Sequence, residues 1–399
     1  MRANATRRVT ILGATGSVGA NTLDLIEHQH KSDPGRFEIE ALTAHRNVID
    51  LARAARRFRP KAAVIGDAQC YGELRSALAG TGIECAAGTE AIVEAASRPA
   101  DWIMAAIVGT AGLRPALAAL KSGVTLALAN KECLVSAGPV FMDAVKRAGT
   151  TLVPVDSEHN AIFQVFDAAN KAAVERLILT ASGGPFRTWT YEQMVHATPE
   201  QALAHPTWSM GMKISVDSAT LMNKGLELIE AHYLFDMPAE RLDVLIHPQS
   251  VVHSLVAHVD GSVLAQMSSP DMRTPIAYAL GYPARLHAPA PRLDLASLGK
   301  LTFEKPDYER FPCLRVAQDV LRRGGAAPTL LTAANEVAVA AFLARRIGFT
   351  AIAEIVEETL AVLLPETGER RPGSLAEVLE IDEAARRAAE IVVRNRASS

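Results

Sequence analysis

The sequence predicts an α/β protein in which a parallel sheet flanked by helices is followed by an α+β region and a C-terminal helical bundle. Three observations carry this prediction. Short, nearly continuous apolar runs alternate with helical patterns over residues 9–156, as expected of strands buried on both faces of a parallel sheet. Over residues 157–285, strand-like runs mix with helices and Gly-Pro loops. From residue 312 onward the pattern is helical.

Composition limits the class of protein. The chain has 399 residues, more than one hydrophobic core usually supports, so we expect two or three domains. It is 49% hydrophobic and 21% charged with a net charge of −3, which favours neither a nucleic-acid partner nor a membrane surface. The four cysteines match no metal or redox spacing and indicate reduced thiols. Because no apolar run approaches the ~20 residues of a spanning helix and the first one is too short for a signal peptide, we expect a cytoplasmic protein.

The expected elements follow in chain order. In the first region we expect six strands, at residues 9–12, 37–43, 61–66, 101–109, 124–129 and 151–155. In the second region we expect strands at 175–182, 242–260 and 262–269, and the late alternation of the 242–260 run favours an antiparallel sheet. The predicted domains are 1–156, 157–285 and 312–399, with a proline-rich linker at 286–311.

Three glycines, Gly13, Gly16 and Gly19, directly follow the first strand and open a helix. Glycines there allow a tight turn and a close approach of the backbone to a pyrophosphate, which the free amides of the helix N-terminus attract. This strand–turn–helix context predicts a Rossmann-like dinucleotide site. The other residues that line the loop are Thr15, Ser17 and Val18.

The end of the second strand indicates which dinucleotide binds. NAD sites place an acidic residue there to bond the ribose hydroxyls. Here the strand runs into "AHRN", with Arg46 and Asn47 and no carboxylate. Arg46 suits the 2′-phosphate of NADP(H), so we expect NADPH as the cofactor. The alternative is an arginine that only solvates the strand end.

Asp156 and Glu158 follow the carboxyl end of a strand, where ligands bind in open α/β sheets. If the chain is extended there, the two carboxylates face the same way and suit Mg²⁺ or Mn²⁺. Taken alone, the pair is more often a helix cap. A third ligand on the helical segment 213–235 favours the metal, and it is either Glu227 or Glu230, because spacing does not choose between them.

Short polar side chains near these glutamates suggest a pocket for a phosphate group. Ser218, Asn223 and Lys224 lie in the same segment, and Ser182 begins a strand-end loop with two glycines after it. Each of these two segments, taken alone, is more often an ordinary polar loop.

Two further segments carry candidate functional residues. Asn130, Lys131 and Glu132 end a buried strand, where burying polar side chains costs free energy and so indicates a role. Lys131 could polarise a substrate oxygen or hold the nicotinamide end of the cofactor. The loop 202–212 carries His205 and Trp208, which suggests a lid that excludes water, although an arbitrary tryptophan is more often core.

Six motifs occur in order: "GATGSVG", "ANKE", "VDSEHNAIFQ", "SGGPF", "HPTWSMG" and "DSATLMNKGLE". Together they resemble the 1-deoxy-D-xylulose 5-phosphate reductoisomerase family, over residues 9 to about 390. The resemblance implies an enzyme that rearranges 1-deoxy-D-xylulose 5-phosphate and reduces the resulting aldehyde with NADPH. The product is 2-C-methyl-D-erythritol 4-phosphate, in non-mevalonate isoprenoid biosynthesis. The resemblance further implies a divalent metal (Mg²⁺, Mn²⁺ or Co²⁺) and a homodimer.

The resemblance also implies the site residues. Metal ligands fall on Asp156, Glu158 and Glu227, which settles the choice against Glu230. Residues that contact the phosphate fall on Ser182, Ser218, Asn223 and Lys224. Other substrate contacts fall on Lys131, Ser157, Glu158, His205, Trp208 and Glu227, with His159 beside the metal. Catalytic roles are expected for Lys131, Asp156, Glu158, His205 and Glu227. Cofactor contacts fall on Thr15, Gly16, Ser17, Val18, Arg46, Asn47, Asn130, Glu132, Gly211 and Met272, in addition to the loop glycine Gly13.

The chain departs from the family pattern at Ala181 and Thr207, where glycine and asparagine are frequent, and in its "AHRN" loop, where other members carry a lysine or a different basic residue. Two other functions stay open. An NADPH-dependent reductase for another polyol phosphate would keep the glycine loop and metal triad without needing "HPTWSMG". A non-catalytic NADPH sensor would have no use for three converging carboxylates.

Overall fold

The computed structural model describes residues 6–367 and 370–397. The chain forms two compact units. Unit 1 comprises the chain up to Cys133 together with Asp143–Phe163 and Asp271–Pro291. Unit 2 comprises Leu134–Met142, Gln164–Pro270 and the chain from Arg292 onward. The domain boundaries predicted from the sequence stay a prediction.

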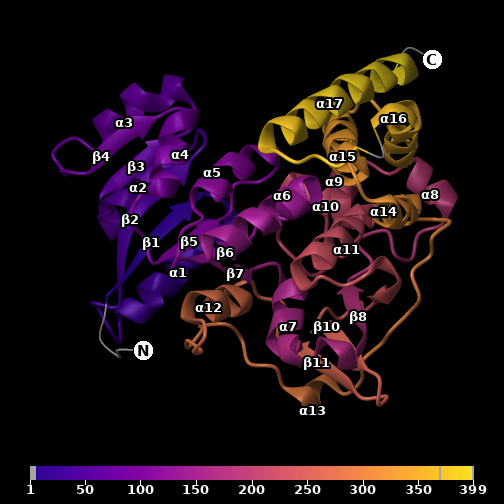
Figure 1. Cartoon of the computed structure of the whole chain (residues 1–399), viewed down its shortest axis with the longest axis horizontal. Coiled ribbons are helices and arrows are strands. Elements are labelled where there is room, and N and C mark those ends of the chain that lie inside the picture. The colour runs from indigo at the N-terminus through magenta and orange to yellow at the C-terminus, as the bar shows by residue number, and fades with distance from the viewer. Residues whose placement is uncertain (1–5, 368–369, 398–399) are drawn as a thin grey trace. The chain divides into compact units, whose positions relative to one another are not determined.

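Unit 1 is built on a seven-stranded sheet in the order β4-β3-β2-β1-β5-β6-β7, with every pair parallel (Figure 1). The predicted α/β class is confirmed. The strands are β1 Arg7–Leu12, β2 Phe37–Ala44, β3 Ala62–Ile65, β4 Glu84–Ala87, β5 Trp102–Ala105, β6 Thr125–Leu128 and β7 Thr151–Pro154. The sequence missed β4, because this short edge strand reads "ECAA" and is only partly buried.

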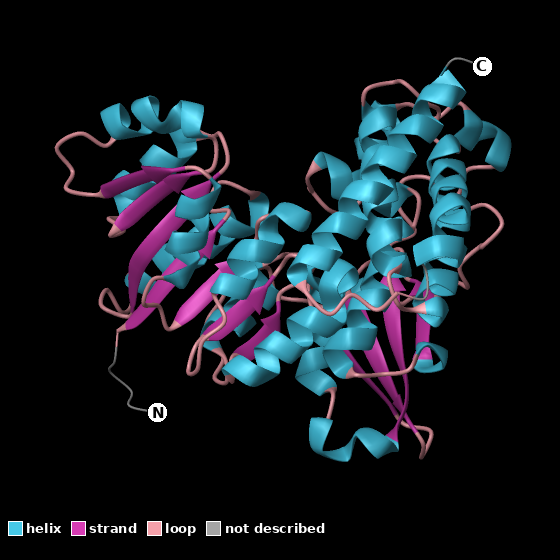
Figure 2. Ribbon diagram, turned by 45° about the horizontal axis from the view of Figure 1, so that its top comes forward, coloured by secondary structure: helices cyan, strands magenta, loops and turns pink. Residues whose placement is uncertain are grey.

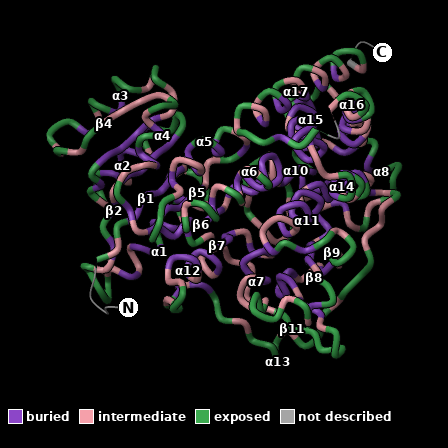
Figure 3. The backbone as a smooth tube through the Cα atoms, in the orientation of Figure 1, coloured by how far each residue is buried: buried purple, intermediate pink, exposed green. Residues whose placement is uncertain are grey.

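Helices pack on both faces of this sheet because successive strand residues point to opposite sides. Along β3, Ala63 and Ile65 belong to one apolar cluster, and Ala62 and Val64 belong to another. Apart from the partly buried edge strand β4, the strands are therefore largely buried, and most of their backbone is purple in Figure 3. The helical elements of unit 1 are α1 Ser17–His30, α2 Val48–Phe58, η1 Ala68–Cys70, α3 Tyr71–Ala77, α4 Thr89–Ser97, η2 Thr110–Gly112, α5 Leu113–Ala118, α12 Arg273–Gly281 and α7 Ser157–Val165, whose residues from Gln164 on belong to unit 2.

Unit 2 contains a four-stranded sheet in the order β11-β10-β8-β9 (Figure 2). Its strands are β8 Val174–Ala181, β9 Leu242–Ile246, β10 Val252–His258 and β11 Val263–Met267. The run at 242–260 that we expected to be one strand is two, separated at "HPQSV". The sheet is also mixed, since β8 pairs antiparallel with β10 but parallel with β9.

The remaining helical elements include four C-terminal helices, in agreement with the helical pattern of the sequence. Within unit 2 these elements are η3 Ala168–Ala173, α8 Tyr191–Val195, α9 Pro199–Leu203, α10 Met212–Ala219, α11 Met222–Phe235, η4 Ala239–Arg241, α13 Leu295–Leu298, α14 Pro312–Arg323, α15 Ala327–Leu343, α16 Ala351–Thr367 and α17 Leu375–Ala397. Helix α6, Glu132–Ala148, takes part in both units. No helix among the described residues is long and apolar enough to cross a membrane.

Candidate active site

The glycine loop of unit 1 connects β1 to α1 and has the conformation that a dinucleotide site needs. Gly13 has φ +88°, and a Cβ there would lie 2.6 Å from the carbonyl oxygen of Ala106. A Cβ on Gly19 would lie 2.3 Å from the carbonyl oxygen of Gly13, so this position also requires glycine. Gly16 is the N-cap of α1, and no side chain of the described residues caps the helix there. The first amides of α1 are therefore available to an anion.

Arg46 and Asn47 lie at the carboxyl end of β2 and already have local partners. The Arg46 Nε donates to Asp67 Oδ2 at 2.7 Å, although the arginine side chain is 71% exposed. A backbone hydrogen bond from Gln69, followed by the bond from Arg46, holds the pKa of Asp67 below its usual value. The Asn47 side chain caps α2 by accepting from the Asp50 amide. Asp67 is a residue of this region that the sequence reasoning did not single out.

Asn130 anchors the loops at the carboxyl edge of the sheet. Its Nδ2 donates to the carbonyl oxygens of Ile107 and Gly109 at 2.6 and 3.0 Å, and its Oδ1 accepts from the amide of Glu132. The side chain thus joins the segment that follows β5 to the one that follows β6. Its buried position is explained by these three bonds.

Lys131 and Asp156 follow the neighbouring strands β6 and β7 and form an ion pair. The Lys131 Nζ lies 2.6 Å from Asp156 Oδ2, and the two side chains are 7% and 17% exposed. Since the carboxyl ends of parallel strands meet at one edge of a sheet, this pairing is the local consequence of the β6–β7 register.

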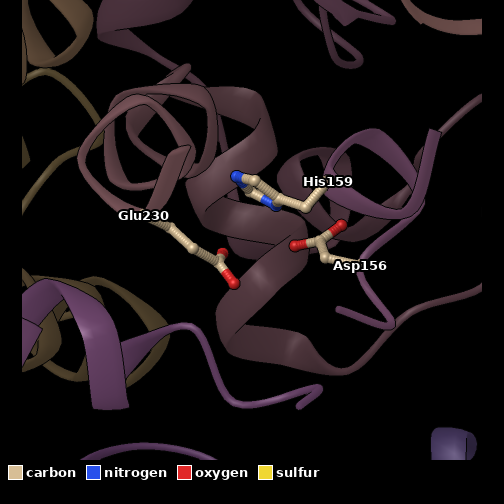
Figure 4. Close-up of side chains that lie close together, drawn as sticks. All are labelled: Asp156, His159 and Glu230. Carbon is tan, nitrogen blue, oxygen red and sulfur yellow. The ribbon is translucent and has the colours of Figure 1, made fainter. Parts of the chain in front are cut away.

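Asp156 and Glu158, the two carboxylates that suggested a metal site, are arranged differently from our expectation. We expected an extended chain, but α7 begins at Ser157, so Glu158 is already helical and Asp156 directly precedes the helix. A ligand atom of Asp156 still lies within 4.8 Å of ligand atoms of Glu158 and of His159. Figure 4 shows Asp156 and His159 next to each other at the start of α7. Ser157 donates to Glu158 Oε2 at 2.5 Å.

In unit 2, α10 and α11 carry the second group of predicted residues. Asn223 and Lys224 both donate to the carboxylate of Glu227, one to each oxygen. Lys224 and Glu227 are 3% and 1% exposed, so this is a buried charged pair. Glu230 is equally buried one turn later. Leu221 joins the two helices with a left-handed φ of +59°, which costs a leucine about 1–2 kcal/mol. Such strain clusters at functional sites.

The loop after β8 lies against the end of α10. Ser182 Oγ accepts from the amide of Gly184, and Gly183 and Gly184 have left-handed φ values of +86° and +68°. A Cβ on Gly184 would lie 2.6 Å from the carbonyl oxygen of Ser218. The two predicted phosphate segments of unit 2, Ser182–Gly184 and Ser218, are therefore neighbours.

His205 joins the predicted lid to this loop, and its bonds fix its tautomer. Nδ1 accepts from the amides of Thr207 and Trp208 at 3.1 and 2.9 Å, so the ring proton sits on Nε2. Nε2 lies 2.9 Å from Ser182 Oγ and donates to it. Burial lowers the pKa of His205, which favours this neutral form.

Trp208 is half-buried and packs beside His253, with ring centroids 6.2 Å apart. His253 Nε2 lies 2.8 Å from Ser268 Oγ, and burial lowers the pKa of His253 to about 4. The sequence reasoning missed His253, and the available signal was a second histidine in the run "HPQSVVHS". Gly211 is the N-cap of α10 in unit 2, and Met272 is the N-cap of α12 in unit 1.

Comparison with known proteins identifies the chain. Three family profiles match in succession: "1-deoxy-D-xylulose 5-phosphate reductoisomerase" over residues 9–138, its "C-terminal domain" over 152–235 and "DXP reductoisomerase C-terminal domain" over 267–388. The chain is 63% identical over 357 residues to the reductoisomerase of Rhodospirillum centenum, covering 90% of this chain and 88% of that one. It is 57% identical to the reductoisomerase of Zymomonas mobilis, covering 95% and 96%.

Solved structures agree with this assignment. The structure of the Zymomonas mobilis enzyme in complex with NADPH matches with a TM-score of 0.90 and 55% identity, covering 98% of this chain and 99% of that one. A reductoisomerase in complex with NADPH, fosmidomycin and magnesium matches with a TM-score of 0.91 and 43% identity, covering 97% and 98%. The chain belongs to the 1-deoxy-D-xylulose 5-phosphate reductoisomerase family.

Proposed function

We propose that this protein converts 1-deoxy-D-xylulose 5-phosphate to 2-C-methyl-D-erythritol 4-phosphate, using NADPH and a divalent metal. It is an oxidoreductase that rearranges the carbon skeleton of the substrate and then reduces the resulting aldehyde. The observation that carries the proposal is the set of buried charges on α11. Lys224 and Glu227 are withdrawn from water in a family whose solved members hold NADPH and magnesium. Burying charges costs free energy, so a ligand-binding role explains their place.

The metal ligands that we propose are Asp156 and Glu158 of unit 1 and Glu227 of unit 2. Their donors are all carboxylate oxygens, which hard cations such as Mg²⁺ and Mn²⁺ prefer. When bound, the metal supplies Lewis-acid polarisation of the substrate oxygens.

Lys131 and Ser157 lie beside the proposed metal ligands of unit 1. Lys131 neutralises Asp156 while carrying donors that suit a substrate oxygen. Ser157 donates to Glu158 and so orients that carboxylate. We assign both residues to the substrate, as the family motif implies.

The phosphate pocket that we propose is formed in unit 2 by Ser182, Ser218, Asn223 and Lys224. The proximity of the Ser182 loop to the end of α10 supports it. His205 adds a neutral N–H at Ser182, and Trp208 belongs to the same loop, which we assign as the lid over the substrate. Binding energy from the phosphate, remote from the reacting carbons, is available to orient them.

NADPH is assigned to the glycine loop and the carboxyl edge of the unit 1 sheet. Its pyrophosphate takes the loop of Gly13, Thr15, Gly16, Ser17 and Val18, and its 2′-phosphate takes Arg46 and Asn47. The nicotinamide end is assigned to Asn130, Glu132, Gly211 and Met272. The exposed guanidinium of Arg46 supports the 2′-phosphate assignment.

We further propose that the protein is a cytoplasmic homodimer without a nucleic-acid or membrane partner. Strand β11 lies at the edge of the unit 2 sheet and exposes Val263 and Leu264 at 51% and 48%. An exposed apolar edge strand is a template for pairing with another chain. Light scattering coupled to size-exclusion chromatography tests this, because a monomer mass at micromolar concentration contradicts it.

The test of the function is NADPH oxidation, followed by absorbance, with 1-deoxy-D-xylulose 5-phosphate, with and without Mn²⁺. NMR identifies the product. Metal-dependent oxidation with a branched product is the expected result. An unbranched product would favour a reductase for another sugar phosphate, and NADPH binding without oxidation would favour the sensor.

A further inference from the structure

Asp217 is a buried acid that none of the proposed roles uses. It lies on α10 immediately before Ser218, and its side chain is 1% exposed, whereas Ser218 is half-buried. A carboxylate withdrawn from water needs partners that compensate its charge. Those partners therefore indicate what holds α10 in place.

Two partners approach the two oxygens of Asp217 from different positions. The Asn335 Nδ2, on α15, donates to Oδ1 at 2.8 Å. The Lys213 Nζ, one turn earlier on α10, lies 2.8 Å from Oδ2. Helices α10 and α15 are in contact, and both belong to unit 2. A hydrogen bond to a charged acceptor is among the stronger polar contacts in proteins.

Asn335 is itself placed rigidly. Nearly all residues of helix α15 are buried, and Asn335 is 0% exposed. Six positions earlier on the same helix, Thr329 donates to the carbonyl oxygen of Ser136 in α6 at 2.7 Å. A donor held by a close-packed helix fixes the position of its acceptor more firmly than an exposed one does.

The position of Asp217 determines where Ser218 points. Adjacent helical residues project about 100° apart, so rotation of α10 about its axis moves both side chains together. The Ser218 carbonyl lies against Gly184, leaving no space for a Cβ, and Leu221 shortly afterwards is left-handed. A change in the orientation of α10 therefore displaces Ser218 relative to the Ser182 loop.

We propose that Asn335 is a positioning residue for the substrate phosphate. Acting through Asp217, it sets the orientation of α10 and so places Ser218 for the phosphate group. The inference rests on the proposed role of Ser218 and assigns the C-terminal helix α15 a part in substrate affinity. Asn335 touches neither substrate nor cofactor.

The test compares Asn335→Asp, Asn335→Ala and the exchanged pair Asp217→Asn/Asn335→Asp. Asn335→Asp places two carboxylates face to face, and we expect the KM for 1-deoxy-D-xylulose 5-phosphate to rise about 30-fold or more, with the KM for NADPH within about twofold. Asn335→Ala gives a smaller rise, of about 10-fold. In the exchanged pair, the amide now at position 217 donates to the carboxylate now at position 335, and we expect most of the affinity to return.

The matched control is Thr332→Val, a change at a buried position on the same helix. Among the described residues its hydroxyl has no hydrogen-bond partner, so the variant reports packing alone. Melting temperatures are measured for every variant, and kinetics well below the lowest. If Asn335→Asp does not fold, Asn335→Ala decides the question.

Ser218→Ala separates the inference from the function on which it rests. If Ser218→Ala leaves the substrate KM unchanged, the phosphate role of Ser218 is wrong. If Ser218→Ala raises that KM but Asn335→Asp and Asn335→Ala behave like Thr332→Val, the positioning role is wrong. The positioning role is also wrong if the exchanged pair Asp217→Asn/Asn335→Asp loses substrate affinity by the sum of its two changes, with no recovery.

Discussion

The glycine loop of unit 1 offers backbone to a ligand, whereas the α10–α11 segment of unit 2 offers charged side chains. In unit 1, Gly13 and Gly19 leave no space for a Cβ, and the amides of α1 are available at the surface. In unit 2, Lys224, Glu227 and Asp217 are almost fully withdrawn from water. The unit 1 site therefore depends on the shape of the main chain, whereas the unit 2 site depends on buried charges that partners compensate. Substitutions should therefore act on the two sites by different physical routes.

The largest effect is expected for Lys224→Ala in unit 2. The change removes a buried cation beside Glu227 and the proposed partner of the phosphate. We expect the KM for the sugar phosphate to rise by two to three orders of magnitude, about 3–4 kcal/mol, with the fold intact. Steady-state kinetics checks this, and Lys171→Ala is the control, because Lys171 is a partly exposed lysine of unit 2 that pairs with Asp236 and has no proposed role. An unchanged substrate KM would rule out the phosphate role.

A pH effect on stability should also arise in unit 2. Burial lowers the pKa of His253 from 6.5 to about 4, so the folded state prefers neutral histidine. The stability is complete above pH 6.5 and falls as the pH drops toward 4, because the unfolded state binds the proton first. The expected loss is about 3 kcal/mol.

Urea denaturation between pH 8 and pH 4 measures this loss, and the pH dependence of the unfolding free energy is compared with that of His253→Gln. The variant should lack most of this dependence. Equal slopes for the wild type and His253→Gln would contradict the burial argument.

In unit 1, one glycine variant is expected to lower stability and another is expected to weaken NADPH binding. Gly19→Ala places a Cβ 2.3 Å from the carbonyl oxygen of Gly13 and should cost about 1–3 kcal/mol of stability. Gly16→Ala has room, since its nearest contact is at 3.5 Å, so it should leave stability nearly unchanged and weaken NADPH binding. Thermal denaturation and NADPH titration separate the two. A stability loss in Gly16→Ala equal to that in Gly19→Ala would be evidence against the loop geometry.

The smallest effect is expected for Arg46→Ala, because its side chain is exposed and already paired with Asp67. Affinity for NADPH should fall about 10-fold while affinity for NADH stays the same. The ratio of the two dissociation constants is the measurement. Equal losses for both dinucleotides would mean that Arg46 does not read the 2′-phosphate.

The sequence predicted unit 1 well because its signals are local. The glycine loop, the apolar strands and the end of β2 each lie within one short stretch. Glu158 was expected on an extended chain, and only the start of α7 at Ser157 corrects this. Strand β4 was missed for a physical reason: a short edge strand needs few apolar residues.

Unit 2 was harder because its contacts join residues far apart in the chain. Asn335 and Asp217 are separated by 118 positions, and Trp208 meets His253 from a distant loop. The parallel β8–β9 pair likewise depends on a helical crossover that no local pattern encodes. Helical spacing placed Glu227 and Glu230 on one helix and could not choose between them.

The central claim is that Glu227 is buried to hold a metal, with Asp156 and Glu158. Titration of Mn²⁺ followed by electron paramagnetic resonance tests it directly, on the wild type, Glu227→Gln and Glu230→Gln. Both glutamates are 1% exposed on the same helix, so the second variant is a close control. We predict that Glu227→Gln weakens Mn²⁺ binding about 100-fold and that Glu230→Gln changes it little. The opposite order, or equal losses, would contradict the assignment.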